Sequence, residues 1–220
     1  MKTTIGIAAI SIIASSSAFA GDYTTTQNER PLVAPAGAIF SSVRWDLSTV
    51  GVGVEYGVME DMSVSLGGLG FDIENSAAMT DVTVGVGYSV MSGDGLDVAA
   101  GLNIPSSFGY IGVDMSTRYA IMDGLAIRTG DGLLMYTIDG GDIGIHLGLG
   151  LTYQVADNMH VDLDTNLVDM AGGMTISIAD AQIINIGAGY NMDDMDFGLS
   201  LNNVTGGDAM GFGLAFAYRM

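Results

Sequence analysis

Hydrophobic and polar residues alternate with a period of two along almost the whole chain after residue 38. A period of two places successive side chains on opposite faces of a β-strand. The pattern predicts about twelve strands, with lengths near the roughly 9 to 11 residues that a tilted strand needs to cross a bilayer. The expected strands cover residues 39–47, 50–58, 62–67, 82–90, 96–104, 111–121, 125–137, 143–155, 159–167, a segment ending at Tyr190, 195–201 and 210–220.

Six tyrosines form an internal repeat, because each lies near the end of every second expected strand. Five of them precede short segments of Asp, Asn, Ser and Gly, which are the residues that tight hairpin turns need. Phenol rings at one height on an apolar face form an aromatic girdle between hydrocarbon and headgroups. A soluble β-sandwich is the alternative, but it would not place a phenol at the same end of every second strand. The girdle residues are Tyr56, Tyr88, Tyr119, Tyr153, Tyr190 and Tyr218.

The C-terminal strand carries a separate signal, because Phe212, Leu214, Phe216, Tyr218 and Met220 alternate to the last residue. This strand resembles the terminal strand by which bacterial outer-membrane β-barrels are recognised for assembly. The mature chain as a whole resembles the porin-like class of these barrels, although the class usually ends on an aromatic residue rather than Met220. The resemblance implies a transmembrane antiparallel up-and-down barrel with both termini in the periplasm. Its expected partners are outer-membrane lipids and the barrel-assembly machinery.

The N-terminus predicts export and a division into three parts. Residues 1–20 have a basic Lys2, an apolar stretch and a small-residue site before Gly21, which is typical of a cleaved signal peptide. A membrane anchor is the alternative, but the apolar stretch is too short to span. Residues 21–35 form either a periplasmic segment or a lumen plug, and residues 36–220 form the barrel.

The charge balance excludes several classes of protein. The chain has 6 basic and 25 acidic residues, a formal net charge of -19 and no cysteine. A nucleic-acid binder needs many Lys and Arg residues, so nucleic acid is not an expected partner. The absence of Cys excludes disulfide scaffolds and zinc-thiolate sites. No cofactor is expected, and divalent cations are expected to bridge lipid phosphates at the outer surface.

Register arguments place a row of charged residues on the inward face of five strands. Antiparallel partners keep a constant sum of residue numbers, and each turn sets that sum. The sums place Asp97 opposite Arg118, Arg118 opposite Arg128, Arg128 opposite Thr152, and Thr152 opposite Asp162. The row is interpreted either as a charge ladder that neutralises itself or as the constriction of a pore. The other inward acids, Asp46, Glu55, Asp114, Asp164 and Asp196, outnumber the remaining inward bases, Arg44 and Arg219.

The two histidines do not form a shared site in this arrangement. His146 is expected opposite residue 168 and His160 opposite Gln154, about 26 Å apart along the sheet at roughly 3.3 Å per residue. His160, Asp162 and Asp164 share one strand face, which is a weak signal for a metal or a proton relay. No Ser/His/Asn constellation like that of the outer-membrane phospholipase is present, so no enzyme is predicted.

Two breaks in the alternation mark expected irregularities. Asp131 falls on the lipid-facing parity of its strand, as do Asp180 and Gln182 on theirs. A buried Asp in lipid is costly, so bulges are expected near residues 130–132 and 183–184. The alternatives are strand ends that rise above the membrane, or a lateral opening in the wall through which small hydrophobic compounds pass.

The connections opposite the tyrosine turns are expected to be short, which argues against a receptor for large ligands. They are expected near residues 48–49, 73–80, 105–108, 139–142, 168–175 and 203–208. Together with a lumen of Gly, Ser and Asp, they favour a small porin-like pore for passive diffusion of small hydrophilic solutes or cations. The alternatives are a structural or interaction barrel with a plugged lumen, and a lateral-opening transporter.

Overall fold

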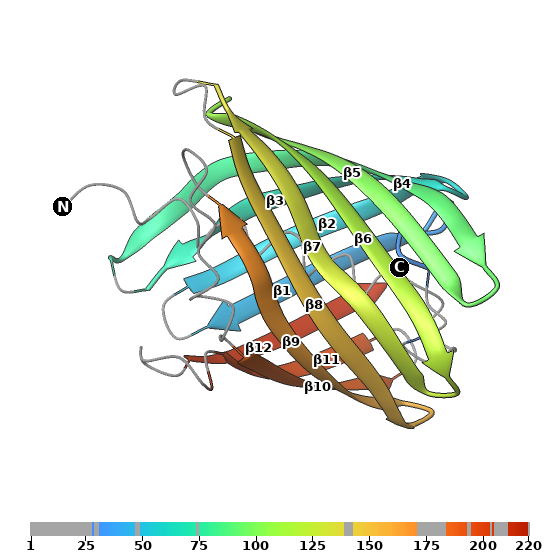
Figure 1. Cartoon of the computed structure of the whole chain (residues 1–220). Coiled ribbons are helices and arrows are strands. Elements are labelled where there is room, and N and C mark those ends of the chain that lie inside the picture. The colour runs from blue at the N-terminus through green and yellow to red at the C-terminus, as the bar shows by residue number, and fades with distance from the viewer. Residues whose placement is uncertain are drawn as a thin grey trace.

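The computed structural model describes residues 28, 31–46, 49–73, 75–138, 143–170, 184–192, 195–202, 204 and 211–219. Over these residues twelve antiparallel strands close into one barrel, as the alternation predicts (Figure 1). Each strand pairs with its neighbours in sequence, and β1 pairs with β12 to complete the ring. The strands are β1 (Ile39–Asp46), β2 (Thr49–Met59), β3 (Met62–Asp72), β4 (Ala77–Gly93), β5 (Leu96–Pro105), β6 (Tyr110–Met122), β7 (Leu125–Thr137), β8 (Ile143–Ala156), β9 (Met159–Met170), β10 (Ile184–Met192), β11 (Met195–Asn202) and β12 (Gly211–Arg219).

The outer face of the barrel is apolar and the inner face is small or polar. On β2, for example, Val52, Val54 and Tyr56 are exposed on the outer face, whereas Gly53 and Glu55 alternate with them and are less exposed. The same division recurs around the ring, so large apolar side chains cover the outside of the molecule. This is the arrangement of a barrel surrounded by hydrocarbon. No helix within the described residues is long and apolar enough to cross a membrane.

Two-residue hairpins close the strands at one end of the barrel. Met59 pairs with Met62, and Gly93 pairs with Leu96, which leaves two residues in each turn. In the second turn Asp94 and Gly95 both have positive φ angles, of 53° and 79°. Positive φ at both central positions is typical of the type I′ turn, which matches the twist of the flanking strands.

The opposite end differs from the sequence prediction in two places. β3 continues to Asp72 and β4 begins at Ala77, so these strands are longer than the expected 62–67 and 82–90, and β4 extends into the connection expected at residues 73–80. A connection was expected at residues 168–175, but β9 continues to Met170 and β10 begins at Ile184. The prediction was therefore wrong about where β9 ends, because the alternation weakens there and gives no stop signal. Residues 171–183, which include Asp180 and Gln182, lie outside the described residues, as do residues 1–20.

The bulge expected near residues 130–132 is present in β7. The registers of both neighbouring strand pairs shift there, between Met115 and Thr117 on the β6 side and between Arg128 and Leu133 on the β8 side. The lipid-facing parity changes across the bulge, so that Leu134 is exposed on the outer face. The second expected bulge, near residues 183–184, falls at the edge of the residues that are described.

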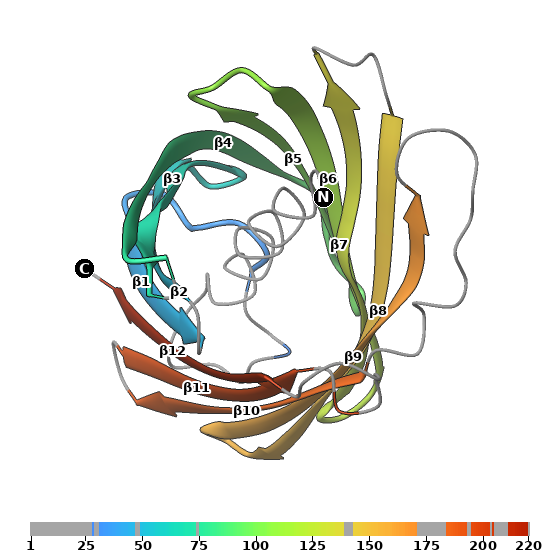
Figure 2. The ribbon, with the colours of Figure 1, turned by 90° about the vertical axis from the view of Figure 1, so that its left-hand side faces the viewer.

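Residues 31–38 run inside the ring of strands before β1 begins (Figure 2). The backbone N–H of Ala34 donates a hydrogen bond of 3.1 Å to Oε1 of Glu55, a lumen residue of β2. Val33 and Ala34 are buried, at 3% and 0% exposure. Ala34 packs with Phe40 in a small apolar cluster. This segment therefore occupies part of the lumen at the end of the barrel where β1 begins.

Candidate functional site

The charge row on the lumen wall begins with an ion pair between β5 and β6. Asp97 and Arg118 are directly opposite, as the register argument predicts. The Nε and Nη2 atoms of Arg118 both donate to Oδ2 of Asp97, at 3.1 and 2.7 Å. The next pairing, between Arg118 and Arg128, is also confirmed. Two guanidinium groups thus lie on neighbouring strands, and the acids around them must offset their repulsion.

The predicted partner of Arg128 on β8 is wrong. Arg128 lies opposite Gly150, whereas Thr152 lies opposite Ala126. The cause is structural: Tyr136, not Thr137, pairs with Ile143, and the β7 bulge shifts the register further. Bulges change the count of residues on one strand, so a sum taken at the turn does not hold beyond them.

Arg128 instead reaches across β8 to two acids of β9. Its Nη2 atom lies 2.8 Å from Oδ2 of Asp164 and 3.2 Å from Oδ1 of Asp162. Thr152 donates a hydrogen bond of 2.6 Å to Asp162, its predicted partner on the neighbouring strand. Nε2 of His160 lies 3.4 Å from the other oxygen of Asp162. We call these five residues the β7–β9 charge network.

Sequence reasoning did not connect Asp164 with Arg128, although it placed both residues in the lumen. The signal that could have joined them is the glycine at position 150, which leaves no side chain between β7 and β9. A long guanidinium side chain can then reach the second strand along. Arg44, on β1, also interacts electrostatically with Asp164. Asp164 therefore interacts with two basic side chains, those of Arg128 and Arg44.

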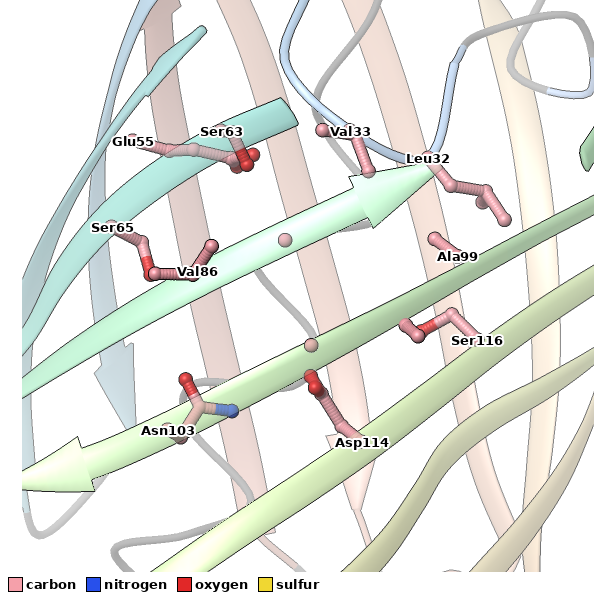
Figure 3. A pocket seen from close by; sticks show the side chains of 13 residues that line it. Leu32, Val33, Glu55, Ser63, Ser65, Val86, Ala99, Asn103, Asp114 and Ser116 are labelled. Atoms are coloured by element: carbon pink, nitrogen blue, oxygen red, sulfur yellow. The ribbon is translucent and has the colours of Figure 1, made fainter. Parts of the chain in front are cut away.

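Two further lumen acids, Glu55 and Asp114, lie on β2 and β6. A cavity of about 60 Å³ lies between the lumen wall and the N-terminal segment, and we call it the acidic pocket. Glu55 and Asp114 bring carboxylates to it, and no basic residue is among those that line it (Figure 3). Oδ1 of Asp114 is buried with no hydrogen-bond partner among the described residues. The lining is Leu32, Val33, Glu55, Ser63, Ser65, Val86, Gly87, Ala99, Ala100, Gly101, Asn103, Asp114 and Ser116.

The remaining predicted lumen residues lie on β1, β8, β11 and β12. Asp196, on β11, is 1% exposed, and its strand partners are Asn191 and Ala217. Asp46 is the last residue of β1, opposite Gly213. The side chains of Asp46, Arg219 and His146 are not among those described.

The six tyrosines of the expected girdle occupy equivalent positions in the sheet. Each one lies directly opposite the first residue of the preceding odd-numbered strand, for example Tyr88 opposite Met62 and Tyr119 opposite Leu96. All six side chains are exposed on the outer face, between 40 and 54%. The other four pairs are Tyr56 with Ile39, Tyr153 with Leu125, Tyr190 with Met159 and Tyr218 with Met195.

A second set of aromatic residues at the other end was missed from the sequence. Trp45 makes an edge contact with Phe212, with ring centroids 6.5 Å apart. Phe71 and Tyr136 are exposed near the same ends of β3 and β7. Aromatic residues next to the opposite connections were the available signal, and girdles at both interfaces are usual in membrane barrels.

The C-terminal strand exposes Leu214, Phe216 and Tyr218 on the outer face, and Phe216 packs against Phe197 of β11 at 5.3 Å between ring centroids. Met220 lies outside the described residues. The recognition of this strand by assembly machinery stays a prediction.

The histidines are well separated along β8 and β9. His160 lies opposite Gln154 as expected, but His146 lies opposite Asp169 rather than residue 168, because a register shift falls between Leu147 and Gly148. Within the described ranges, no three His, Cys, Asp or Glu residues are grouped so that they could hold a metal ion. His160 and Asp162 instead belong to the β7–β9 charge network.

A closed twelve-stranded barrel of this kind is the fold of bacterial outer-membrane porins. The chain is similar to a KdgM porin structure, with a TM-score of 0.59, 11% identity, and coverage of 82% of this chain and 98% of that one. A KdgM porin in complex with disordered oligogalacturonate gives a TM-score of 0.56 at 11% identity, with the same coverage. A NanC porin structure gives 0.53 at 13% identity, covering 84% of this chain and 100% of that one. No protein-family model and no curated protein matches the sequence.

Proposed function

We propose that this protein is a bacterial outer-membrane pore for the passive diffusion of small hydrophilic solutes, with a preference for cations. The observation that carries the proposal is the charge of the lumen wall. Arg118 and Arg128 are both ion-paired to aspartates, while the acidic pocket holds carboxylates without a basic residue in its lining. A pore lined in this way attracts cations and repels anions.

The number of strands in the barrel supports an open channel through the lumen. Eight-stranded barrels are filled by their own side chains, whereas barrels of about 16 to 18 strands hold aqueous channels. Twelve strands lie between these limits, so small residues on the inner face decide how much space remains. Gly, Ser and Thr occupy many of these positions, for example Gly51, Gly53, Ser63 and Ser65. Residues 31–38 reduce the space further at one end.

Acidic oligosaccharides are not the cargo that this lumen favours. One structural neighbour was solved with oligogalacturonate, which carries one carboxylate per sugar unit. This chain has 25 acidic and 6 basic residues, so a polyanion would meet repulsion and few partners. We therefore infer that this chain shares the barrel fold of that neighbour, but not its ligand.

Export and membrane insertion belong to the same proposal. The apolar outer face and the outward tyrosines require a membrane around the barrel. Residues 1–20 would direct the chain across the inner membrane and be removed, and the tyrosine turns would face the periplasm. A barrel of this type in bacteria lies in the outer membrane.

The proposal is tested by the uptake of three labelled solutes into liposomes that contain the purified protein. Glucosamine, glucose and glucuronate differ in charge on one sugar skeleton, so they separate charge selection from size. We expect glucosamine to enter fastest and glucuronate slowest. Fastest entry of glucuronate would overturn the cation preference. Uptake equal to that of protein-free liposomes would overturn the pore and favour a structural barrel with a plugged lumen.

A double variant tests whether the acidic pocket causes the preference. Glu55→Gln with Asp114→Asn removes both carboxylates and keeps similar side-chain volumes. We expect the uptake of glucosamine to fall towards that of glucose, because the local attraction for cations is lost. Asp157→Asn, in an exposed turn outside the lumen, is the matched control and should leave the ratio unchanged.

A further inference from the structure

Several polar lumen side chains lie directly over a glycine of the neighbouring strand. Gly101 is opposite Asp114, and Gly189 is opposite His160. A Cβ atom at Gly101 would overlap the carboxylate of Asp114, and one at Gly189 would overlap the imidazole of His160. These polar groups therefore lie flat along the wall, in space that only a glycine leaves.

Gly150 has the same role for an ion pair that spans three strands. It lies on β8, opposite Arg128 of β7 on one side and Asp164 of β9 on the other. A Cβ atom there would lie 2.8 Å from Nε and 2.9 Å from Cγ of Arg128, and would overlap Oδ1 of Asp164. The Arg128–Asp164 pair, at 2.8 Å, thus crosses β8 over the bare backbone of Gly150.

The consequence for the lumen follows from its limited width. With twelve strands, each side chain that stands upright from the wall removes a large share of the free cross-section. A Cβ atom at any of these glycines would occupy the space in which the flat group lies. The atoms that it would meet belong to side chains and not to backbone, so the displaced group would shift, and the open space beside it is the lumen.

We propose that Gly101, Gly150 and Gly189 are the positions that set the width and the charge of the conduction path. These glycines have no side chain, so Asp114, the Arg128–Asp164 pair and His160 can lie against the wall. This inference rests on the proposed pore function and deepens it, since it names backbone positions rather than charged groups as determinants of selectivity.

The test is single-channel conductance of Gly189→Ala in planar bilayers. We expect conductance on the order of two-fold below that of the wild type, because the imidazole of His160 is pushed into a narrow lumen. Gly187→Ala is the matched control on the same face of β10. A Cβ atom there would lie 3.4 Å from Cβ of Asp162, which is ordinary contact, so conductance should not change.

A second variant separates pore width from damage to the barrel. Gly189→Ala combined with His160→Ala should restore the wild-type conductance, because the displaced ring is gone. Gly150→Ala should also change the ratio of cation to anion permeability, since it displaces charges, whereas Gly187→Ala should not. Wild-type conductance in Gly189→Ala, or low conductance that His160→Ala does not restore, would overturn the inference. A silent wild-type protein would instead overturn the proposed pore and this inference with it.

Discussion

At the scale of single residues, the main effect of the lumen arginines is to neutralise the acids beside them. They do not make the lumen wall positive. Arg118 has 10% of its side chain exposed and binds Asp97 through two nitrogen atoms. Arg128 is shared between Asp162 and Asp164. Removing one partner of such a pair leaves the other charge uncompensated. The arginines therefore limit the acidity of the lumen.

The double variant Arg118→Ala with Arg128→Ala tests this compensation. Asp97, Asp162 and Asp164 would lose their partners, so the lumen would become more negative. We expect the ratio of cation to anion permeability, measured from the reversal potential in a salt gradient, to rise above the wild-type value. The comparison variant Asp97→Asn should move the ratio in the opposite direction. A lower ratio in the arginine variant would show that these side chains do not oppose the acids.

The pairing of these residues could be predicted from the sequence only as far as the strands are regular. Asp97 and Arg118 lie on β5 and β6, which pair from Asn103 and Gly112 to Leu96 and Tyr119 without a register shift, so the sum set at their connection still holds at the other end of the strands. The partners of Arg128 could not be predicted, because the β7 bulge shifts the register and because the side chain reaches past its neighbouring strand. Alternation shows where a bulge must fall, as at Asp131, but not how many residues it displaces.

At the scale of elements, one hairpin repeat accounts for most of the barrel. The tyrosine, the short turn and the next strand recur five times, and Tyr218 in the C-terminal strand ends the series. Turn residues and period-two alternation are both local signals, so the number and order of strands could be predicted well. The end of β9 could not, because neither signal marks residue 170.

The N-terminal segment is the element with the most direct effect on the size of the path. Leu32 and Val33 cover the acidic pocket, and Ala34 is held by Glu55. Deletion of residues 31–35 should therefore raise single-channel conductance, because it uncovers part of the lumen. Phe108→Ala, at an exposed connection outside the lumen, is the control and should have no effect.

Unchanged conductance in the deletion variant would show that solutes pass beside the segment without being limited by it. Heat-modifiable migration on gels checks that the barrel has folded in both variants. This control separates a wider lumen from a damaged one.

At the scale of the whole molecule, the barrel reverses the usual distribution of apolar residues. Large aliphatic and aromatic side chains cover the outside, and the inside is built from small residues and a few charged groups. Closure of the sheet pairs β1 with β12, so the ring has no free strand edge. Among the described residues, charged side chains such as Arg118, Arg128 and Asp164 lie on the lumen wall, and others such as Asp94 and Asp157 lie in turns.

The reversal potential of the wild-type protein in a planar bilayer, under a gradient of potassium chloride, tests the central claim most directly. The claim is that a water-filled lumen with an excess of acids conducts, and conducts cations better than anions. It predicts discrete channel openings and a reversal potential that gives a potassium to chloride permeability ratio above one. A folded protein that gives no openings, or a ratio below one, would contradict it.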